Sequence, residues 1–155
     1  MTQHADLIDQ YLAGPPTLRQ AIAGMTAVQY DATPIPGKWS TRQVVCHLAD
    51  FEPVYADRMK RVIAMSEPTF FGGDPGVFAS RLAYDRRDVD EELRLIEAVR
   101  SQMARILRTL AEENFQRIGH HSERGPLTLE TLLRQITEHL PHHLRFVEQK
   151  RAAIG

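Results

Sequence analysis

Three of the seven histidines of the chain lie within five residues, in the run Glu138-His139-Leu140-Pro141-His142-His143. Imidazole nitrogens are ligands for zinc, nickel, copper and iron. On a helix, residues at i and i+4 are about 6 Å apart along the axis, so His139 and His143 can contact the same ion. Two imidazoles are half of a tetrahedral site, which predicts a third ligand elsewhere in the chain.

The residues around these histidines have the apolar spacing of an amphipathic helix. The apolar residues recur every three or four positions, at Leu129, Leu132, Leu133, Ile136, Leu140, Leu144 and Val147. His143 lies on this stripe and His139 at its edge, whereas His142 points to the polar side. Pro141 removes one backbone donor, but it lies opposite the stripe, so we expect one kinked helix.

A second helix supplies the candidate for the third ligand. Ser40 followed by Gln43 is a capping box, which predicts a helix start. The apolar face that follows consists of Val44, Leu48, Phe51, Tyr55, Met59 and Val62. His47 lies at the edge of this face, as His139 does on its own helix, so both project inward if the two helices are neighbours. We interpret Cys46, which points elsewhere around the helix, as a small core side chain.

Three neutral imidazoles would leave a fourth position open for water, as in catalytic zinc sites. Spacing alone leaves two interpretations equally supported. The first is a metal site, and the second is a group of histidines at the edge of the core that are satisfied by hydrogen bonds.

Three carboxylates lie close to these histidines in the sequence. Asp50 and Glu52 follow His47 within two turns, and Glu138 adjoins His139. Each is a candidate to orient a ligand or to act as a general acid or base. The alternative, a carboxylate on the exposed face of a helix, is the commoner situation.

Four further basic residues have an open role. Arg58 shares the angular face of His47 three turns later, where it can bind a substrate anion or, as is more common, pair with a carboxylate. His120 and His121 lie in a predicted loop, where they either approach the site or are solvated. We expect His4, near the N-terminus, to be solvated.

The first part of the chain predicts an interrupted helix. Residues 3–12 read as a helix that Gly14-Pro15-Pro16 interrupts, and Thr17 can cap a continuation as far as Met25. Residues 31–38 contain two prolines and a glycine, which predicts a loop.

The second half predicts two more long helices. Residues 66–76 are rich in glycine and proline and read as a loop that carries an exposed pair, Phe70-Phe71, before a short helix over residues 77–84. Asp88 and Glu91 mark the start of the third long helix, whose stripe is Leu93, Ile96, Val99, Met103, Ile106 and Leu110. Residues 114–126 read as a loop, and Thr128 can cap the last helix.

No segment alternates with the period of two that is typical of strands, so the fold class is all-α. Four amphipathic segments predict a four-helix bundle, and the long stretch between the second and third predicts one crossover connection. A length of 155 residues fits a single domain over residues 1–155.

The composition of the chain limits the kinds of binding partner and the cellular compartment that we expect. A net charge of −1 gives no general reason to expect nucleic acid or a membrane as partner. One cysteine excludes an internal disulfide framework. There is no apolar run long enough to span a bilayer and no signal-peptide pattern. We therefore expect a cytoplasmic protein, and we carry a homodimer as a hypothesis.

The run Gly37-Lys38-Trp39-Ser40-Thr41-Arg42-Gln43-Val44-Val45-Cys46-His47-Leu48-Ala49-Asp50-Phe51-Glu52 resembles the hallmark of the DinB-like, YfiT-related proteins. The run Leu127-Thr128-Leu129-Glu130-Thr131-Leu132-Leu133, which leads into the histidine cluster, is similar to the second motif of that family. The resemblance covers residues 5–150. It implies a four-helix bundle with a three-histidine metal site at His47, His139 and His143.

The resemblance also implies a set of functions. Some relatives are thiol-dependent transferases or isomerases, which suggests a metal that activates water or a low-molecular-weight thiol toward a small-molecule substrate. We expect a divalent transition metal, zinc foremost, with nickel or iron as alternatives. A thiol transferase and a hydrolase are both consistent with such a site. The alternative from another class is a non-catalytic metal-binding protein with a stress-linked or interaction role.

Overall fold

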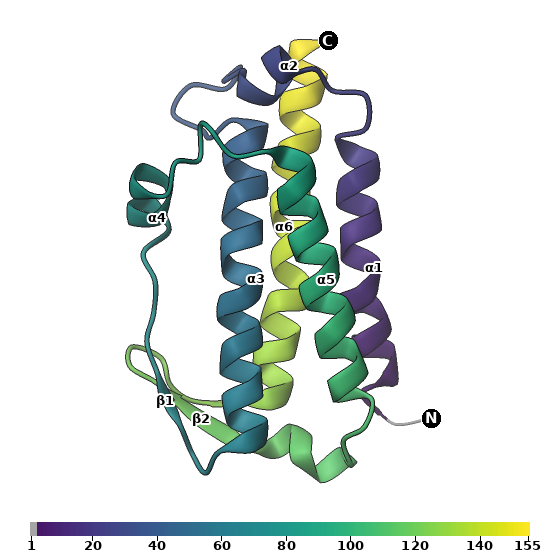
Figure 1. Cartoon of the computed structure of the whole chain (residues 1–155), viewed down its shortest axis with the longest axis vertical. Coiled ribbons are helices and arrows are strands. Elements are labelled where there is room, and N and C mark those ends of the chain that lie inside the picture. The colour runs from purple at the N-terminus through teal and green to yellow at the C-terminus, as the bar shows by residue number, and fades with distance from the viewer. Residues whose placement is uncertain (1–2) are drawn as a thin grey trace.

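The computed structural model of the chain describes residues 3–155. Its four long helices are α1 (Ala5–Ala21), α3 (Thr41–Ala64), α5 (Val89–Leu107) and α6 (Leu129–Ile154). Helices α1 and α3 each pack against both α5 and α6, so the four form a closed bundle (Figure 1). Helices α1 and α6 run in one direction, and α3 and α5 in the other. The predicted all-α four-helix bundle is confirmed.

The connection between α3 and α5 is the predicted crossover. Because these two helices run in the same direction, residues 65–88 must return along the length of the bundle (Figure 1). This return contains strand β1 (Thr69–Phe70) and the short helix α4 (Pro75–Arg81). A further short helix, α2 (Ala27–Asp31), follows a capping box at Thr26 that the sequence interpretation did not use.

Three of the predicted helix starts are confirmed. At each, a side-chain oxygen accepts the backbone N–H three residues later, in the pairs Ser40–Gln43, Asp88–Glu91 and Thr128–Thr131. These caps fix where α3 and α6 begin, and therefore how far along each helix its histidines lie. Helix α6 continues through Pro141, which is exposed.

The predicted interruption of the first helix is wrong. Helix α1 passes through Pro15 and Pro16 without a break. Pro15 has no N–H for the carbonyl of Tyr11, which instead accepts a hydrogen bond from Arg100 Nη1 at 2.7 Å. Thr17 does not cap a new helix, because its hydroxyl donates to the Gly14 carbonyl at 2.6 Å. A partner from another helix therefore compensates for the missing donor.

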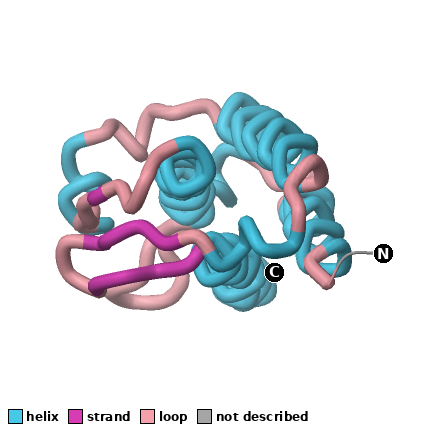
Figure 2. The backbone as a smooth tube through the Cα atoms, turned by 90° about the horizontal axis from the view of Figure 1, so that it is seen from below, coloured by secondary structure: helices cyan, strands magenta, loops and turns pink. Residues whose placement is uncertain are grey.

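A small sheet occupies segments that were predicted to be loops. Strand β1 pairs in parallel with β2 (Ile118–His121), which pairs antiparallel with β3 (Gly125–Thr128). Figure 2 shows these strands beside the helices at one end of the bundle. Strands of two to four residues are too short to produce a readable alternation.

The sheet also corrects the prediction that both phenylalanines of the loop are exposed. Phe70 is 5% exposed and packs in the core, whereas Phe71 is 74% exposed. Cys46 is fully buried, as its interpretation as a core residue requires. Within residues 3–155, no helix combines the length and the apolarity needed to cross a lipid bilayer.

Candidate metal centre

The three histidines meet between α3 and α6. His47 comes from α3, and His139 and His143 come from adjacent turns of α6. The distance from His47 Nε2 to His139 Nε2 is 2.9 Å, and that to His143 Nε2 is 3.2 Å. One ligand atom from each residue lies within 4.8 Å of the others. The structure therefore brings together the three candidate ligands that the sequence singles out.

This cluster has the dimensions of a transition-metal site. Zn–N bonds of 2.0–2.1 Å place the ligand nitrogens of a tetrahedral ion roughly 3.3 Å apart, close to the observed 2.9 and 3.2 Å. A neutral imidazole carries one N–H, so the nitrogen of His47 cannot donate to both of its neighbours. A cation at the centre could accept the lone pairs of all three nitrogens. The donor set therefore fits an ion better than it fits a hydrogen-bond network.

Packing holds these imidazoles in place. The centroid of the His47 ring lies 5.2 Å from that of Trp39 and 4.9 Å from that of Phe51. The Nδ1 atoms of His47 and His139 are buried and have no hydrogen-bond partner among residues 3–155. Ring orientation thus depends on aromatic neighbours rather than on the carboxylate or carbonyl that often fixes a ligating histidine.

The environment keeps the imidazoles neutral. Burial lowers the pKa of His47 to about 4, and the nearby Asp50 carboxylate opposes this shift only in part. Burial also lowers the pKa of His139 to about 3 and that of His143 to about 4, with the neighbouring histidines adding to both shifts. All three are therefore unprotonated at pH 7, which is the form that binds metal.

A cavity of about 550 Å³ gives access to the cluster. Trp39 and Phe51 line it beside the three histidines. Its remaining lining includes Tyr55, Arg58, His121, Glu123 and Arg124. This volume is in the range of small-molecule sites, and the apolar rings next to the histidines limit the water that surrounds a bound molecule.

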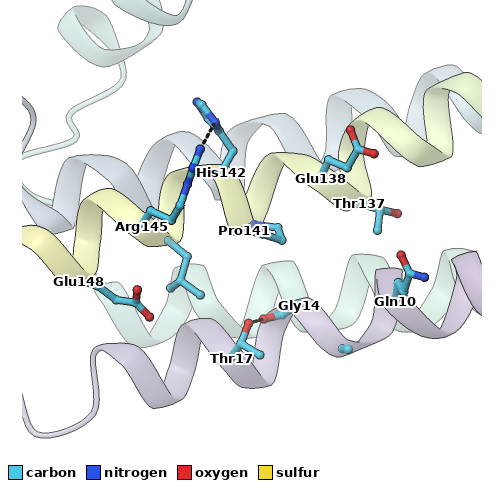
Figure 3. A pocket seen from close by; sticks show the side chains of 11 residues that line it. Gln10, Gly14, Thr17, Thr137, Glu138, Pro141, His142, Arg145 and Glu148 are labelled. Atoms are coloured by element: carbon cyan, nitrogen blue, oxygen red, sulfur yellow. Dashed lines mark hydrogen bonds between the residues drawn. The ribbon is translucent and has the colours of Figure 1, made fainter.

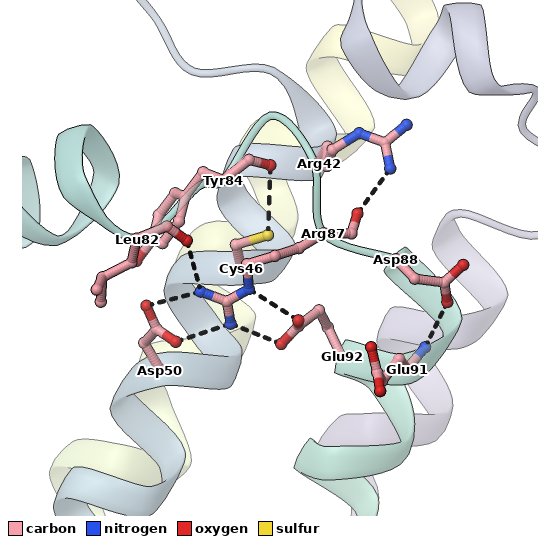
Figure 4. Close-up of polar contacts among 9 residues, drawn as sticks. All are labelled: Arg42, Cys46, Asp50, Leu82, Tyr84, Arg87, Asp88, Glu91 and Glu92. Carbon is pink, nitrogen blue, oxygen red and sulfur yellow. Dashed lines mark hydrogen bonds and ion pairs between the residues drawn. The ribbon is translucent and has the colours of Figure 1, made fainter.

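Two of the three candidate carboxylates are engaged elsewhere. Asp50 binds Arg87 through both oxygens, at 2.8 and 3.1 Å, and Arg87 also binds Glu92 (Figure 4). Glu52 is fully buried in an ion pair with Arg100. Neither carboxylate lines the histidine cavity.

The third candidate, Glu138, opens onto a different cavity. It is exposed and lines a space of about 670 Å³ between α1 and α6, together with Pro141 and Arg145 (Figure 3). Although this space is the larger of the two, it contains none of the three clustered histidines. His142 is exposed, as predicted, and its Nδ1 lies 3.4 Å from Arg145 Nη2.

The structure adds residues to the site that the sequence interpretation left open or missed. His121 lines the cavity, whereas His120 faces away and lies 3.1 Å from Glu67. Arg58 forms no ion pair with a carboxylate of residues 3–155; it donates to the Phe71 carbonyl at 2.7 Å. No motif or spacing in the sequence singles out Glu123 or Arg124. Gly125, with φ of 75°, indicates a turn at this point, but nothing local indicates that the turn covers a cavity.

The expectation that His4 is solvated is wrong. His4 is 4% exposed, and its ring stacks on Phe115 with centroids 3.9 Å apart. Its Nδ1 lies 2.6 Å from a carboxylate oxygen of Glu112, and its Nε2 lies 3.2 Å from one of Glu130. These contacts join the start of α1 to residues 112–116 and to the first turn of α6, which are more than 100 residues away in the sequence.

Comparison with known proteins agrees with this geometry. A sequence model described as the DinB superfamily matches residues 10–147. The chain is 28% identical over 142 residues to YfiT of Bacillus subtilis, with 91% of this chain and 80% of the relative covered. It is 27% identical over 133 residues to a protein of Oceanobacillus iheyensis, with coverage of 86% and 77%. Both relatives are named as candidate metal-dependent hydrolases.

A solved structure extends the likeness to the fold. The structure of Bacillus subtilis YfiT, described as an unusual four-helix bundle topology, superposes with a TM-score of 0.91 at 27% identity. The match covers 99% of this chain and 88% of the other.

Proposed function

The chain belongs to the DinB superfamily, and from that premise we propose that it is a metal-dependent hydrolase whose metal is held by His47, His139 and His143. The observation that carries the proposal is the convergence of three neutral imidazoles at an accessible cavity. The names of its relatives, which are candidate metal-dependent hydrolases, support the same reaction class.

The three histidines would hold a divalent transition ion, zinc foremost, with nickel and iron also suited to imidazole ligands. An ion with three histidine ligands and an open position lowers the pKa of bound water to about 7, or binds a small thiol as its thiolate. The carboxylate candidates Asp50, Glu52 and Glu138 do not line the cavity. Glu123 is the carboxylate that does line it, and its side chain lies beside Gly72.

Other residues of the cavity would position the substrate. The rings of Trp39 and Phe51 lie against His47 and would exclude water from the reacting atoms. Tyr55 lies further along the cavity, and its hydroxyl donates to Gln135 at 3.2 Å, which fixes the ring as part of the wall. These residues therefore favour a substrate with an apolar portion close to the reacting group.

The second candidate is a transferase that uses a low-molecular-weight thiol in place of water. The chain's own thiol cannot take that role, because Cys46 is fully buried and burial raises its pKa to about 12. The thiol would have to come from a cosubstrate. Turnover of a substrate panel in the absence of thiol supports the hydrolase, whereas turnover only after a small thiol is added supports the transferase.

The test of the metal assignment is elemental analysis of purified variants. We expect about one divalent transition metal per wild-type chain, and strong depletion in His47→Ala and His143→Ala, because each removes one of three ligands. His142→Ala is the matched control, since His142 is adjacent in sequence but exposed and paired with Arg145. Circular dichroism on each variant separates loss of metal from loss of fold. Full occupancy in both ligand variants would show that the assignment is wrong.

A further inference from the structure

The cavity that reaches the histidines runs along one face of α3. His47, Phe51, Tyr55 and Arg58 follow one another at intervals of three or four residues, and all four line this cavity. Its histidine end therefore lies toward the start of α3, and Arg58 marks the opposite end. A bound molecule that fills the cavity would contact both ends.

The Arg58 end is strongly cationic. Arg58 is 5% exposed, and neither it nor Arg124 forms an ion pair with a carboxylate of the described chain. Burial, together with the nearby Arg124 charge, lowers the pKa of Arg58. Burial lowers the pKa of His121 as well; both arginines add to that shift, and the Glu123 carboxylate opposes it. The two arginines thus lie at one end of the cavity, and neither has a carboxylate within ion-pair distance.

Burial of an unpaired guanidinium is costly unless its donors are used. Arg58 uses one donor group on the Phe71 carbonyl, and its guanidinium lies 5.0 Å from the centroid of the Tyr55 ring. Glu123, the carboxylate of the cavity, lies by Gly72 and forms no ion pair with either arginine. The remaining donors of Arg58 and those of Arg124 are therefore available to a ligand.

We propose that Arg58 and Arg124 bind the anionic group, a carboxylate or a phosphate, of an extended substrate whose reacting group contacts the histidine cluster. The inference rests on the proposed function for the position of the reacting group. Guanidinium groups bind such anions through paired hydrogen bonds. These hydrogen bonds are stronger when the arginine is buried.

Helix geometry sets the length of this substrate. Arg58 follows His47 by eleven positions, which correspond to a rise of about 16 Å along the helix axis. The guanidinium of Arg58 lies over the ring of Tyr55, which is one helical turn nearer the histidines. The bound anion and the reacting group would therefore be roughly 10 Å apart. The aromatic wall between the two ends fits an apolar linker.

The test is a titration of the zinc-loaded full chain with inorganic phosphate at constant ionic strength, followed by NMR of the arginine side-chain Nε–H groups. We expect saturable shifts at Arg58 and Arg124. Arg124→Gln and Arg58→Gln should each weaken phosphate binding by about tenfold, the equivalent of one charged hydrogen bond. Arg61→Gln is the control, because Arg61 lies on the same helix, is exposed and pairs with Asp57.

Two further measurements make the result unambiguous. Arg124 is exposed, so Arg124→Gln should fold even if Arg58→Gln does not. His143→Ala should keep its phosphate affinity, because the arginines remain; loss in this variant, with unchanged affinity in Arg124→Gln, would place phosphate on the metal and overturn the inference. Absence of saturable shifts would also overturn it. Metal content, measured separately, tests the metal assignment of the proposed function independently of the phosphate result.

Discussion

Arg100, on α5, is a single side chain that contacts the other three long helices. From α5 it donates to the carboxylate of Glu52 on α3, to the Tyr11 carbonyl of α1 and to the Ile136 carbonyl of α6. Both members of the ion pair are fully buried. A buried pair does not by itself indicate net stability, but the loss of one partner leaves a costly unpaired charge.

Arg100→Met is therefore expected to destabilise the fold by about 3–5 kcal/mol at pH 7.5, measured by urea unfolding. Burial raises the pKa of Glu52, and Arg100 opposes this shift, so the variant should raise that pKa further. A carboxyl whose folded pKa is raised favours folding below its unfolded pKa, and this contribution is lost as the pH rises toward the folded pKa. The difference from wild type should thus shrink at pH 5.

The control for this prediction replaces both members of the pair. Arg100→Met combined with Glu52→Leu removes the charge and its partner together, so it should recover much of the lost stability. A pH-independent difference between Arg100→Met and wild type, or a double variant no more stable than the single one, would contradict the account.

At the scale of the element, α1 depends on this same contact. An ideal Cβ on Gly14 would lie 2.5 Å from Arg100 Nη1, so the absence of a side chain there lets the guanidinium reach the Tyr11 carbonyl that Pro15 leaves without a donor. A distant arginine thus supplies the donor that Pro15 removes from the first helix.

Gly14→Ala should therefore destabilise the protein, by about 1–3 kcal/mol, through displacement of Arg100. Inside a helix, replacement of glycine by alanine ordinarily stabilises the protein by about 0.5–1 kcal/mol. A loss of stability in this variant would therefore indicate that Arg100 has been displaced. Thermal unfolding of Gly14→Ala beside Arg100→Met measures it. A stabilised Gly14→Ala variant would show that the guanidinium can move without cost.

Some features of the helices and strands follow from local sequence, and others do not. The caps at Ser40, Asp88 and Thr128 could be predicted, since each is completed within three residues. The continuity of α1 could not, because its partner, Arg100, is 89 residues away from Tyr11 in the chain. The parallel pairing of β1 with β2 also joins segments that are far apart in the chain, since it places Phe70 beside His121.

At the scale of the whole molecule, the same distinction applies to the candidate site. The convergence of His47, His139 and His143 could be anticipated, because helical period places each on its apolar face or at the edge of it, and the family resemblance implies neighbouring helices. The cationic end could not be anticipated. Arg58 and Arg124 are brought together by the sheet, whose strands carry no readable pattern of their own.

The bundle should remain folded when its metal is removed. Apolar residues of all four long helices form its core, in contrast to small zinc domains, where the ion supplies most of the folding free energy. At a free metal concentration of 100 times the dissociation constant, metal binding adds about 2.7 kcal/mol to the free energy of unfolding. Chelation should then lower Tm by about 5–10 °C while the transition stays cooperative. Circular dichroism before and after chelation measures both; collapse of the helical signal would make the metal structural and argue against the hydrolase.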